Sequence, residues 1–409
     1  MNQRRQCKIL QITKAKFPPE IRVVKESLSL HEADYRSAVL CPPFEGQSEY
    51  EVWNGIEIFR PKVLKRFFLE KLFEHITLLS PAWYFAITGI IKRYQPDVLH
   101  IHDIWLGRVA FLSKTNQRVV FDLHENMPAA VVEYLKGYSG LLKLFFQIFQ
   151  SHRRILRYEC AMLERSDMIL ACVAEAKERV LLNYPKLDSN KVHNIENLES
   201  KRFISEPDAG EASFEKDHFS VLYIGGFGPH RGIDTLIRSM VYIKKRQLNV
   251  KVHLIGARPS QYLEMMQTLI ASLGVENEVR ITGWVPVEDV LANICQADVC
   301  CVPHHSNPHT DNTIPHKLYQ YMIAKRPVLV SSSAPLARTV RHSNAGLVFE
   351  AGDPESCANA IVELIQNPQL CLKLSNSGYR YVMEQGHNWE EESTPKLLQA
   401  YDELLLGCN

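Results

Sequence analysis

Small polar and basic residues gather around one short predicted helix in the second half of the chain. The stretch TDNTIPHKLYQYM, residues 310–322, places Asn312, Thr313 and a proline before this helix and Lys317 one turn inside it. Proline suits a first helical turn, and Asn312 or Thr313 suits the cap. The free N–H groups at such a helix start favour an anion. We therefore predict an anion site here, with Lys317 and Gln320 three residues apart on one face. The apolar residues of the helix that we expect to face the core are Leu318, Tyr321 and Met322.

A glycine turn is the second feature that could bind phosphate. The segment VLYIGGFGPHRGIDTLI, residues 221–237, nearly matches a dinucleotide fingerprint, with Gly226 and Gly228 in place but Arg231 at the third position. That substitution argues against a nicotinamide or flavin site. The backbone at Gly225 and Gly226 with the Arg231 guanidinium can still bind phosphate, although a tight turn with a surface arginine explains the segment equally well.

The elements that must position these residues are short apolar strands alternating with amphipathic helical patterns along the whole chain. Such strands are typical of parallel sheets buried on both faces. We expect five of them in the first half, at residues 8–13, 37–42, 97–102, 119–124 and 168–173. We expect six in the second half, at residues 221–225, 250–256, 279–283, 298–303, 327–331 and 346–349. A charged segment after Glu196 interrupts the pattern and suggests a linker. We predict two doubly wound α/β domains, residues 1–200 and 201–387, with a final helix at about 388–409 packing back on the first domain. Ligands should lie at the carboxyl ends of the strands.

The composition of the chain narrows its class. Its 409 residues carry 47 Lys and Arg against 46 Asp and Glu, a net charge of +1, which argues against nucleic-acid binding. Ten cysteines without a pairing pattern indicate reduced thiols in a cytoplasmic protein. No apolar run reaches the roughly 18–20 residues that a spanning helix needs.

Four segments together resemble the donor half of glycosyltransferase family 4: YIGGFGPHRGIDTLI, VRITGWVPVEDVLANICQADVCCVP, TIPHKLYQYMIAKRPVLVSS and AGLVFEAGDPESCANAIVELI. The first half is similar to the opening of bacterial members that build surface polysaccharides. The resemblance implies the GT-B fold, two Rossmann-like domains with a nucleotide-sugar held mainly by the second. It also implies a retaining reaction. Because Arg231 and Lys317 could together bind one diphosphate without a metal, we expect a reaction that needs no metal and no cofactor.

The resemblance also implies roles for individual residues. Arg231 and Lys317 correspond to the diphosphate clamp, and Gln320 to the position that bonds ribose hydroxyls. The backbone at Trp284 and Val285 corresponds to the base-binding strand end, and Trp284 is equally well explained as a packing residue. His124, at the end of VVFDLH, corresponds to an acceptor-domain histidine that positions a sugar hydroxyl and stabilises developing positive charge on the sugar.

Three departures from the family pattern bear on activity. The family's two glutamates, separated by seven residues, are Asn312 and Gln320 here. Gly226 stands where many relatives have arginine, and KAKFPP replaces an N-terminal glycine pair. The chain is therefore either an active enzyme, which we favour, or an inactive partner subunit of the same fold.

Two further features lie in the first half. His100, His102 and Asp103 could ligate a metal, but a core histidine beside a cleft histidine explains the spacing better, so we predict no metal site. The basic amphipathic segments 63–79 and 134–158 favour peripheral contact with an anionic membrane, although packing on a core also explains them. Their basic residues are Lys65, Arg66, Lys143, Arg153, Arg154 and Arg157.

The predicted function is transfer of a hexose-type sugar from a nucleoside diphosphate, with UDP favoured, to a glycan or lipid-linked saccharide. The expected location is the cytoplasm or the inner face of the plasma membrane. The alternative enzyme is a sugar-nucleotide 2-epimerase of the same fold, for which Asp103 and Glu125 are the candidate acid and base. With His124, these two residues complete the catalytic candidates.

Overall fold

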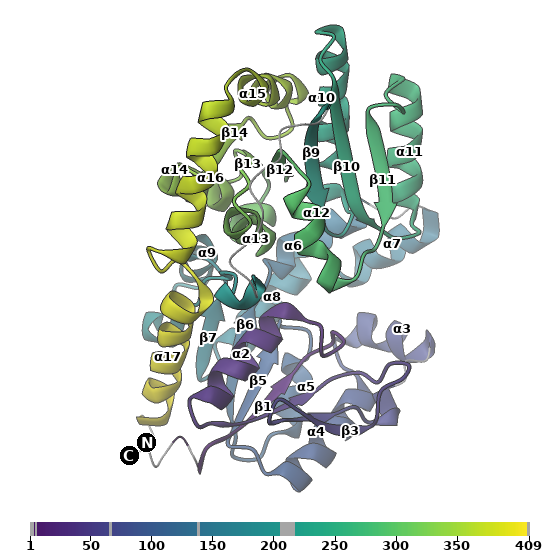
Figure 1. Cartoon of the computed structure of the whole chain (residues 1–409). Helices are drawn as coiled ribbons and strands as arrows, with labels where there is room; N and C mark the ends of the chain where they lie inside the picture. Colours follow the sequence, from purple (N-terminus) through teal and green to yellow (C-terminus); the bar gives the residue numbers. More distant parts are fainter. Residues whose placement is uncertain (1–3, 5, 65–67, 137–139, 205–216, 407–409) are drawn as a thin grey trace. The chain divides into compact units, whose positions relative to one another are not determined.

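The computed structural model describes residues 4, 6–64, 68–136, 140–204 and 217–406. Figure 1 shows the succession of strands and helices along the chain.

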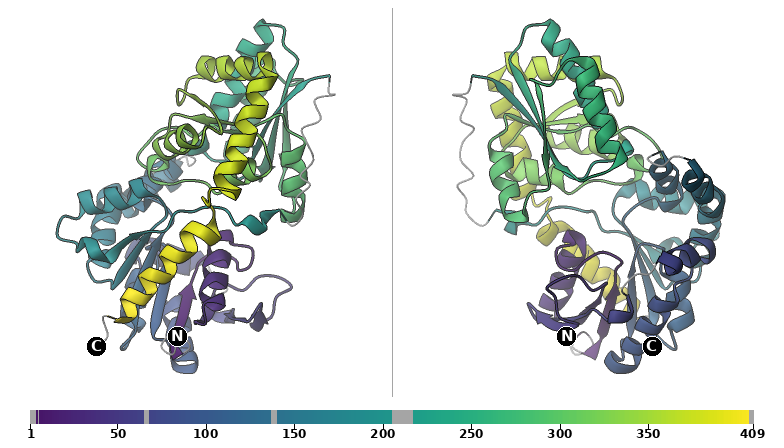
Figure 2. Two further views of the ribbon diagram at one scale, coloured as in Figure 1. Left: turned by 60° about the vertical axis from the view of Figure 1, so that its left-hand side comes forward. Right: turned by 90° about the vertical axis from the view of Figure 1, so that its right-hand side faces the viewer.

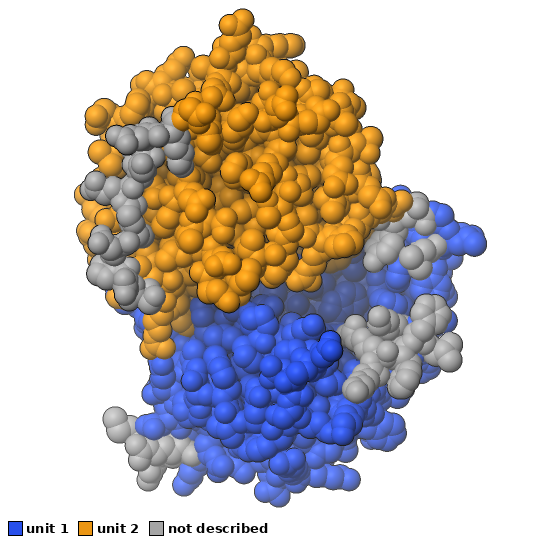
Figure 3. All heavy atoms as spheres, turned by 45° about the vertical axis from the view of Figure 1, so that its right-hand side comes forward, with its two compact units in different colours: residues 1–132, 139–197, 390–409 blue, residues 133–138, 198–389 orange. Residues whose placement is uncertain are grey.

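Contacts divide the chain into two compact units, coloured separately in Figure 3. Unit 1 holds residues 1–132, 139–197 and 390–409, and unit 2 holds residues 133–138 and 198–389. The chain therefore crosses between the units after residues 132, 138, 197 and 389. The short segment 133–138 was not anticipated.

Unit 1 is built on an eight-stranded sheet in the order β3-β4-β2-β1-β5-β6-β7-β8, parallel except for the edge strand β3. The first five apolar strands of the sequence analysis all form. The hairpin of β3 and β4 was missed, because its strand β3 alternates exposed and half-buried residues. The strands are β1 (Lys8–Ile12), β2 (Arg36–Leu40), β3 (Tyr50–Trp53), β4 (Ile56–Phe59), β5 (Val98–His102), β6 (Arg118–Leu123), β7 (Met168–Ala171) and β8 (Val192–Asn194).

Helices cover both faces of this sheet. The N-cap residue Ser80 begins one of them by accepting a hydrogen bond from the Trp83 N–H. The helices of unit 1 are α2 (Ile21–Glu32), α3 (Phe68–Thr77), α4 (Pro81–Tyr94), α5 (Gly107–Ser113), α6 (Met127–Leu135), α7 (Gly140–Phe149), α8 (His152–Leu163), α9 (Ala174–Asn183) and α17 (Thr394–Leu406), of which α6 ends in unit 2.

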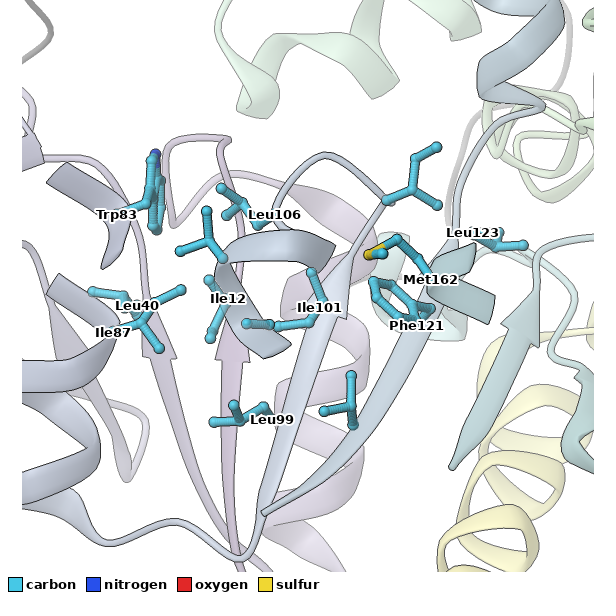
Figure 4. Close-up of a cluster of buried hydrophobic side chains, with 14 of the residues drawn as sticks. Ile12, Leu40, Trp83, Ile87, Leu99, Ile101, Leu106, Phe121, Leu123 and Met162 are labelled. Carbon is cyan, nitrogen blue, oxygen red and sulfur yellow. The ribbon is translucent and has the colours of Figure 1, made fainter. Parts of the chain in front are cut away.

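The core of unit 1 lies between the sheet and its helices. Figure 4 shows branched side chains from β1, β5 and β6 packed against residues of the covering helices, among them Trp83, Ile87 and Met162. On the other face, α17 packs against α2 and β8, as the views in Figure 2 show. The last helix therefore belongs to the first unit.

Unit 2 is a six-stranded parallel sheet in the order β11-β10-β9-β12-β13-β14. This is the doubly wound order in which the chain reverses direction between the first and fourth strands, and ligands bind beyond the strand ends there. All six strands were predicted. They are β9 (Phe219–Ile224), β10 (Val250–Ala257), β11 (Val279–Gly283), β12 (Val299–Val302), β13 (Val328–Ser331) and β14 (Gly346–Phe349).

The helices of unit 2 follow its strands. One of them begins at Gly232, whose φ of 64° is left-handed. A Cβ there would lie 1.8 Å from the Pro303 carbonyl oxygen, so only glycine allows this close approach. The helices are α10 (Ile233–Lys245), α11 (Gln261–Leu273), α12 (Val290–Cys295), α13 (Lys317–Ile323), α14 (Ala334–Ser343), α15 (Pro354–Gln366) and α16 (Pro368–Met383).

Candidate active site

The short helix α13 differs from its prediction at the N-terminus. It starts at Lys317 itself, its N-cap position is His316, and no side chain caps it. The predicted caps fail because Thr310–Asn312 forms a separate 3-10 turn, in which the Asn312 side chain donates to the Pro308 carbonyl. Asn312 and Thr313 therefore lie before the helix without capping it. The predicted anion site must rest on side chains rather than on this seven-residue helix.

Lys317 is buried rather than solvated. Its side chain is 7% exposed, and its ammonium lies 4.1 Å from the centre of the Tyr223 ring on β9. The ammonium also fills the space beside Gly225, where a Cβ would lie only 2.2 Å from Nζ. The glycine at the end of β9 thus leaves room for the lysine of α13.

Arg231 lies in the loop after β9, in the turn Pro229–Arg231. Its Nη1 is 3.3 Å from Nε2 of His304, which follows β12. In the described parts of the chain, neither Arg231 nor Lys317 makes an ion pair or a hydrogen bond with a carboxylate. Two basic side chains, close enough for the charge of Arg231 to lower the pKa of Lys317, therefore lie at the strand ends without an anionic partner among the described residues.

The pKa values of three basic residues around Arg231 are lowered. Burial lowers the pKa of Lys317 well below 10.5, and the nearby Arg231 charge lowers it further. The same two causes lower the pKa of His304 well below its ordinary value and that of His230 to about 2. Buried cations need a counter-charge, and a bound anion would supply it here. The cluster has the charge of a phosphate site.

Gln320 lies one turn after Lys317 and is also buried, at 6% exposure. Its amide nitrogen donates a hydrogen bond of 2.7 Å to Oε2 of Glu199, a residue that the sequence analysis did not select. The side chains of Leu318, Tyr321 and Met322 are fully buried, as predicted. The helix thus presents Lys317 and Gln320 on one side and its apolar residues to the core.

The remaining predicted donor contacts follow β11, at Trp284 and Val285, and β9, at Gly226. Trp284 follows β11, is 58% exposed, and carries the Arg258 guanidinium 4.3 Å from its ring centre. Val285 beside it is half-buried. Gly226 has open space where a side chain would lie, and its carbonyl accepts a hydrogen bond from the Tyr223 hydroxyl. The packing alternative for Trp284 is weakened, because the ring is exposed.

In unit 1, His124 follows β6 and is joined to a buried carboxylate. Oδ2 of Asp122 lies 2.6 Å from Nε2 of His124, and Arg22 binds the same carboxylate through Nε and Nη2 at 2.8 and 2.7 Å. Burial alone would lower the pKa of His124, but the charges of Asp122 and Asp103 outweigh it and raise the pKa to about 10. His124 is therefore an imidazolium at neutral pH.

Asp103 and Glu125 flank this histidine in different ways. Asp103 has a left-handed backbone, with a φ of 61°, and its Oδ1 accepts a hydrogen bond from the His124 backbone N–H. Burial raises the pKa of Asp103 to about 7. Glu125 is half-buried. Asp103 thus shapes the loop that carries His124.

A buried cluster beneath these residues has metal-ligand chemistry. One ligand atom from each of Glu26, His100, His102 and Asp122 lies within 4.8 Å of the others. However, the Arg22 guanidinium already binds Asp122 and lies 3.1 Å from Glu26. A divalent cation would have to displace this buried guanidinium. The donor set therefore fits a hydrogen-bonded network better than a metal centre.

His100 and His102 have separate partners in that network. His100 Nδ1 lies 2.7 Å from the Tyr401 hydroxyl of α17, and His102 Nε2 lies 3.0 Å from Oε1 of Gln11. Both rings are buried, so neither is a cleft-edge histidine as expected. The physical reason is that α2 and α17 cover this face of the sheet. Burial lowers the pKa of His102 to about 4.

Only some of the described basic residues in the amphipathic segments 63–79 and 134–158 are exposed. Lys65 and Arg66 lie outside the described residues. Arg154 donates hydrogen bonds to the carbonyls of His75, Ile76 and Phe149, at the ends of α3 and α7, and so has a structural role. Arg153 and Arg157 are exposed, and Lys143 is half-buried. Of the segments that the structure describes, no helix combines the length and hydropathy of a membrane span.

Several residues of these sites were not selected from the sequence, among them Asp122, Glu199, Tyr223 and Gly232. Asp122 had a usable signal, because an aspartate inside an apolar strand and two residues before His124 must share its face. Glu199 had none, since its partner Gln320 is 121 residues away. Contacts of that range depend on the packing of whole elements.

Comparison with known proteins follows the same division of the chain. Residues 20–198 match the family described as Glycosyltransferase Family 4, and residues 206–381 match Glycosyl transferases group 1. Sucrose-phosphate synthase from Thermosynechococcus elongatus has a similar structure, with a TM-score of 0.78 at 20% identity over 98% of this chain and 100% of that one. An Anabaena protein solved with UDP-glucose, HepE, gives 0.69 at 14% identity, covering 98% and 99%.

The curated relatives match over a smaller share of the chain than the solved structures do. A GDP-mannose-dependent phosphatidylinositol monomannoside mannosyltransferase from Mycolicibacterium smegmatis is 24% identical over 47% of this chain and 51% of its own length. The chain spans about half the length of the curated relatives that it matches first. A D-inositol 3-phosphate glycosyltransferase from Thermobispora bispora is 23% identical over 78% and 74%. With its two Rossmann-like units, the chain belongs to glycosyltransferase family 4 and has the GT-B fold.

Proposed function

We propose that the protein is a retaining glycosyltransferase that takes a hexose-type sugar from a nucleoside diphosphate donor. The observation that carries this proposal is the pair of neighbouring basic side chains, Arg231 and Lys317, at the strand ends of unit 2, which bind no carboxylate of the described residues. A diphosphate brings the missing negative charge. It gains more charge as it leaves the sugar, so the same cations stabilise the transition state more than the ground state.

The remaining donor contacts follow from the same strand ends. Gln320 would bond the ribose hydroxyls, and the exposed Trp284 with the backbone of Val285 would hold the base. Gly225 and Gly226 would border the diphosphate. Asn312 and Thr313 lie before α13, so any donor contact of theirs would come from the loop and not from a helix cap.

His124 would act as a hydrogen-bond donor to a sugar hydroxyl. Its positive charge, held by Asp122, suits a donor and opposes a cation on the sugar ring. We therefore assign it orientation of the substrate rather than charge stabilisation. In the reaction, the bond from C1 to the diphosphate oxygen breaks, an acceptor hydroxyl oxygen bonds to C1 with configuration kept, and the hydroxyl proton passes to a phosphate oxygen.

The donor nucleotide is the finer part of the proposal. UDP is our first choice, and solved proteins of the same fold include complexes with UDP and UDP-glucose. GDP is its competitor, because the first curated relatives are named as GDP-mannose-dependent. The acceptor we propose is a glycan or lipid-linked saccharide.

A surface for a lipid-linked acceptor is available on α7. Leu141, Leu144 and Ile148 recur at three- and four-residue spacing and are 85%, 53% and 59% exposed. The basic side chains of Arg153 and Arg157 on α8 are exposed as well. An exposed apolar stripe with basic residues in the same unit supports peripheral attachment to an anionic membrane at the inner face of the cell membrane.

The test is a transfer assay with UDP-glucose, UDP-N-acetylglucosamine and GDP-mannose, with and without lipid extract as acceptor. We expect one donor to lose its sugar to a lipid or glycan product, with activity retained in EDTA. A changed sugar nucleotide formed without acceptor would show the epimerase instead. Failure of every nucleoside diphosphate to bind would show an inactive subunit and overturn the proposal.

A further inference from the structure

The hydrogen bond between Gln320 and Glu199 fixes the direction of a buried amide. Gln320 Nε2 donates to Glu199 Oε2 at 2.7 Å, and the backbone N–H of Ser200 donates to Oε1 of the same carboxylate at 2.8 Å. A carboxylate oxygen can only accept, so the amide must turn its NH₂ group towards Glu199. The Gln320 carbonyl oxygen therefore points away from Glu199.

The carbonyl oxygen of the Gln320 side chain can accept a hydrogen bond from a ligand. In the described parts of the chain, the Gln320 carbonyl oxygen accepts no hydrogen bond. Lys317, three residues earlier on the same side of α13, likewise has no hydrogen-bond partner there. The helix thus offers one ammonium and one acceptor oxygen, which suit a phosphate and a hydroxyl group.

Glu199 is itself held firmly. The residue is 3% exposed, and its backbone carbonyl accepts a hydrogen bond of 2.9 Å from the Trp389 N–H. Trp389 is 2% exposed, so the two segments that cross between the units meet here within unit 2. No cation pairs with Glu199 in the described chain. A buried carboxylate that binds only neutral donors destabilises the folded protein, so the presence of Glu199 is better explained by function than by stability.

We infer that Glu199 is a positioning residue for the donor: it orients Gln320 so that the amide presents an acceptor oxygen to the ribose hydroxyls of a nucleoside diphosphate. This inference rests on the proposed function and adds the residue that gives the site its preference for ribose. Glu199 acts through Gln320 and does not touch the donor.

The test compares UDP with 2′,3′-dideoxy-UDP, and GDP with its dideoxy analogue, by calorimetry. The wild type should bind the ribose form about fivefold more tightly, which is the worth of one neutral hydrogen bond. In Glu199→Gln, the Ser200 N–H still needs an acceptor, so the new carbonyl oxygen faces Ser200 and the new NH₂ group faces Gln320. The Gln320 amide then turns over and offers a donor to the ribose instead of an acceptor. The ribose preference should then disappear, while the dideoxy analogue binds as before. Glu264→Gln, at an exposed position on α11, is the control and should keep the preference.

The double variant separates positioning from folding. Gln320→Glu alone places two carboxylates 2.7 Å apart in a buried site and should lower the melting temperature and the affinity for both ligands. Glu199→Gln with Gln320→Glu restores one donor and one carboxylate, and should recover both the melting temperature and the ribose preference.

The outcomes distinguish the two proposals. A wild type that binds UDP and dideoxy-UDP equally overturns the role of Glu199 and leaves the glycosyltransferase proposal standing. Equal loss of both ligands in Glu199→Gln, at an unchanged ratio, shows a merely structural role. A wild type that binds no nucleoside diphosphate overturns both proposals.

Discussion

Buried Asp122 and His124, whose side chain is 20% exposed, form an ion pair with 2.6 Å between Oδ2 and Nε2, and buried Arg22 shares the carboxylate. Removing the carboxylate would leave a guanidinium that is 4% exposed without its main partner. We therefore expect Asp122→Asn to lower the free energy of unfolding by about 3–5 kcal/mol, the cost of breaking a buried pair. Asp402→Asn, which breaks the more exposed pair with Arg4, should cost at most about 1 kcal/mol. Urea unfolding measures both, and equal small losses would contradict the assignment.

The Asp122–His124 pair also predicts a range of pH over which its contribution to stability is constant. The raised pKa of His124 gives stability that is present below its ordinary 6.5 and lost as the pH rises through about 10. The depressed pKa of Asp122 gives stability that is present above 3.8 and lost as the pH falls. Between these limits, NMR titration should show His124 charged, with no midpoint near 6.5. A midpoint there would refute the imidazolium.

Gly225 and Gly226 offer a matched pair of substitutions. A Cβ at Gly225 would collide with the Lys317 ammonium, and the φ of 144° strains any side chain, whereas a Cβ at Gly226 meets nothing within 4 Å. Gly225→Ala should therefore weaken nucleoside diphosphate binding by about 1–3 kcal/mol, and Gly226→Ala by little. Calorimetry with UDP and GDP checks this. Similar effects of the two changes would mean that Lys317 is not held against Gly225 in solution.

Donor binding should take up protons. In the free site, burial and Arg231 lower the pKa of Lys317, while Cys301 beside it has the opposite effect. A bound diphosphate reverses this repulsion and raises the pKa again. Calorimetry of UDP in two buffers of different ionisation enthalpy, repeated at several pH values, should thus show net proton uptake on binding. Uridine, which lacks the diphosphate, should show none, and proton release would contradict the site.

Membrane attachment should depend on the stripe of α7. Changing Leu141, Leu144 and Ile148 to Ser should reduce binding to anionic liposomes, while Leu182→Ser, at an 80% exposed leucine on α9, should not. Changing Arg153 and Arg157 to Glu should weaken binding further at low salt, because charge attraction is screened beyond about 8 Å at physiological ionic strength. Wild-type protein that ignores such liposomes at low salt would refute attachment through α7.

Arg154 must be left out of that charge reversal. It holds three backbone carbonyls at the ends of α3 and α7, so Arg154→Glu should unfold this region and lower the melting temperature. A variant with an unchanged melting temperature would show that these bonds contribute little.

Much of the fold could be predicted from the sequence, because apolar strands and helical periodicity depend on local patterns. The parallel strands of both units and the burial of Leu318, Tyr321 and Met322 followed from those patterns. The cap of α13 did not, since a separate turn at Thr310–Asn312 competes for the same residues.

The candidate site was less accessible to sequence reasoning. From the sequence alone, a lysine inside a helix is expected to be exposed to solvent. Only the packing of α13 against β9 shows that Lys317 is buried over the Tyr223 ring. The charge of His124 depends on Arg22 and Asp122, which come from different elements. Such electrostatic effects need the three-dimensional arrangement.

The most direct test of the account is calorimetry of UDP and GDP, with uridine and guanosine as controls, on the wild type, Arg231→Ala and Lys317→Ala. Each substitution should weaken diphosphate binding by about 1.5–3 kcal/mol, the range for charge-assisted hydrogen bonds, and nucleoside binding by much less. Arg238→Ala, at an exposed arginine on α10, should change neither. Equal losses for nucleoside and diphosphate, or diphosphate binding that survives both substitutions, would contradict a diphosphate site at Arg231 and Lys317.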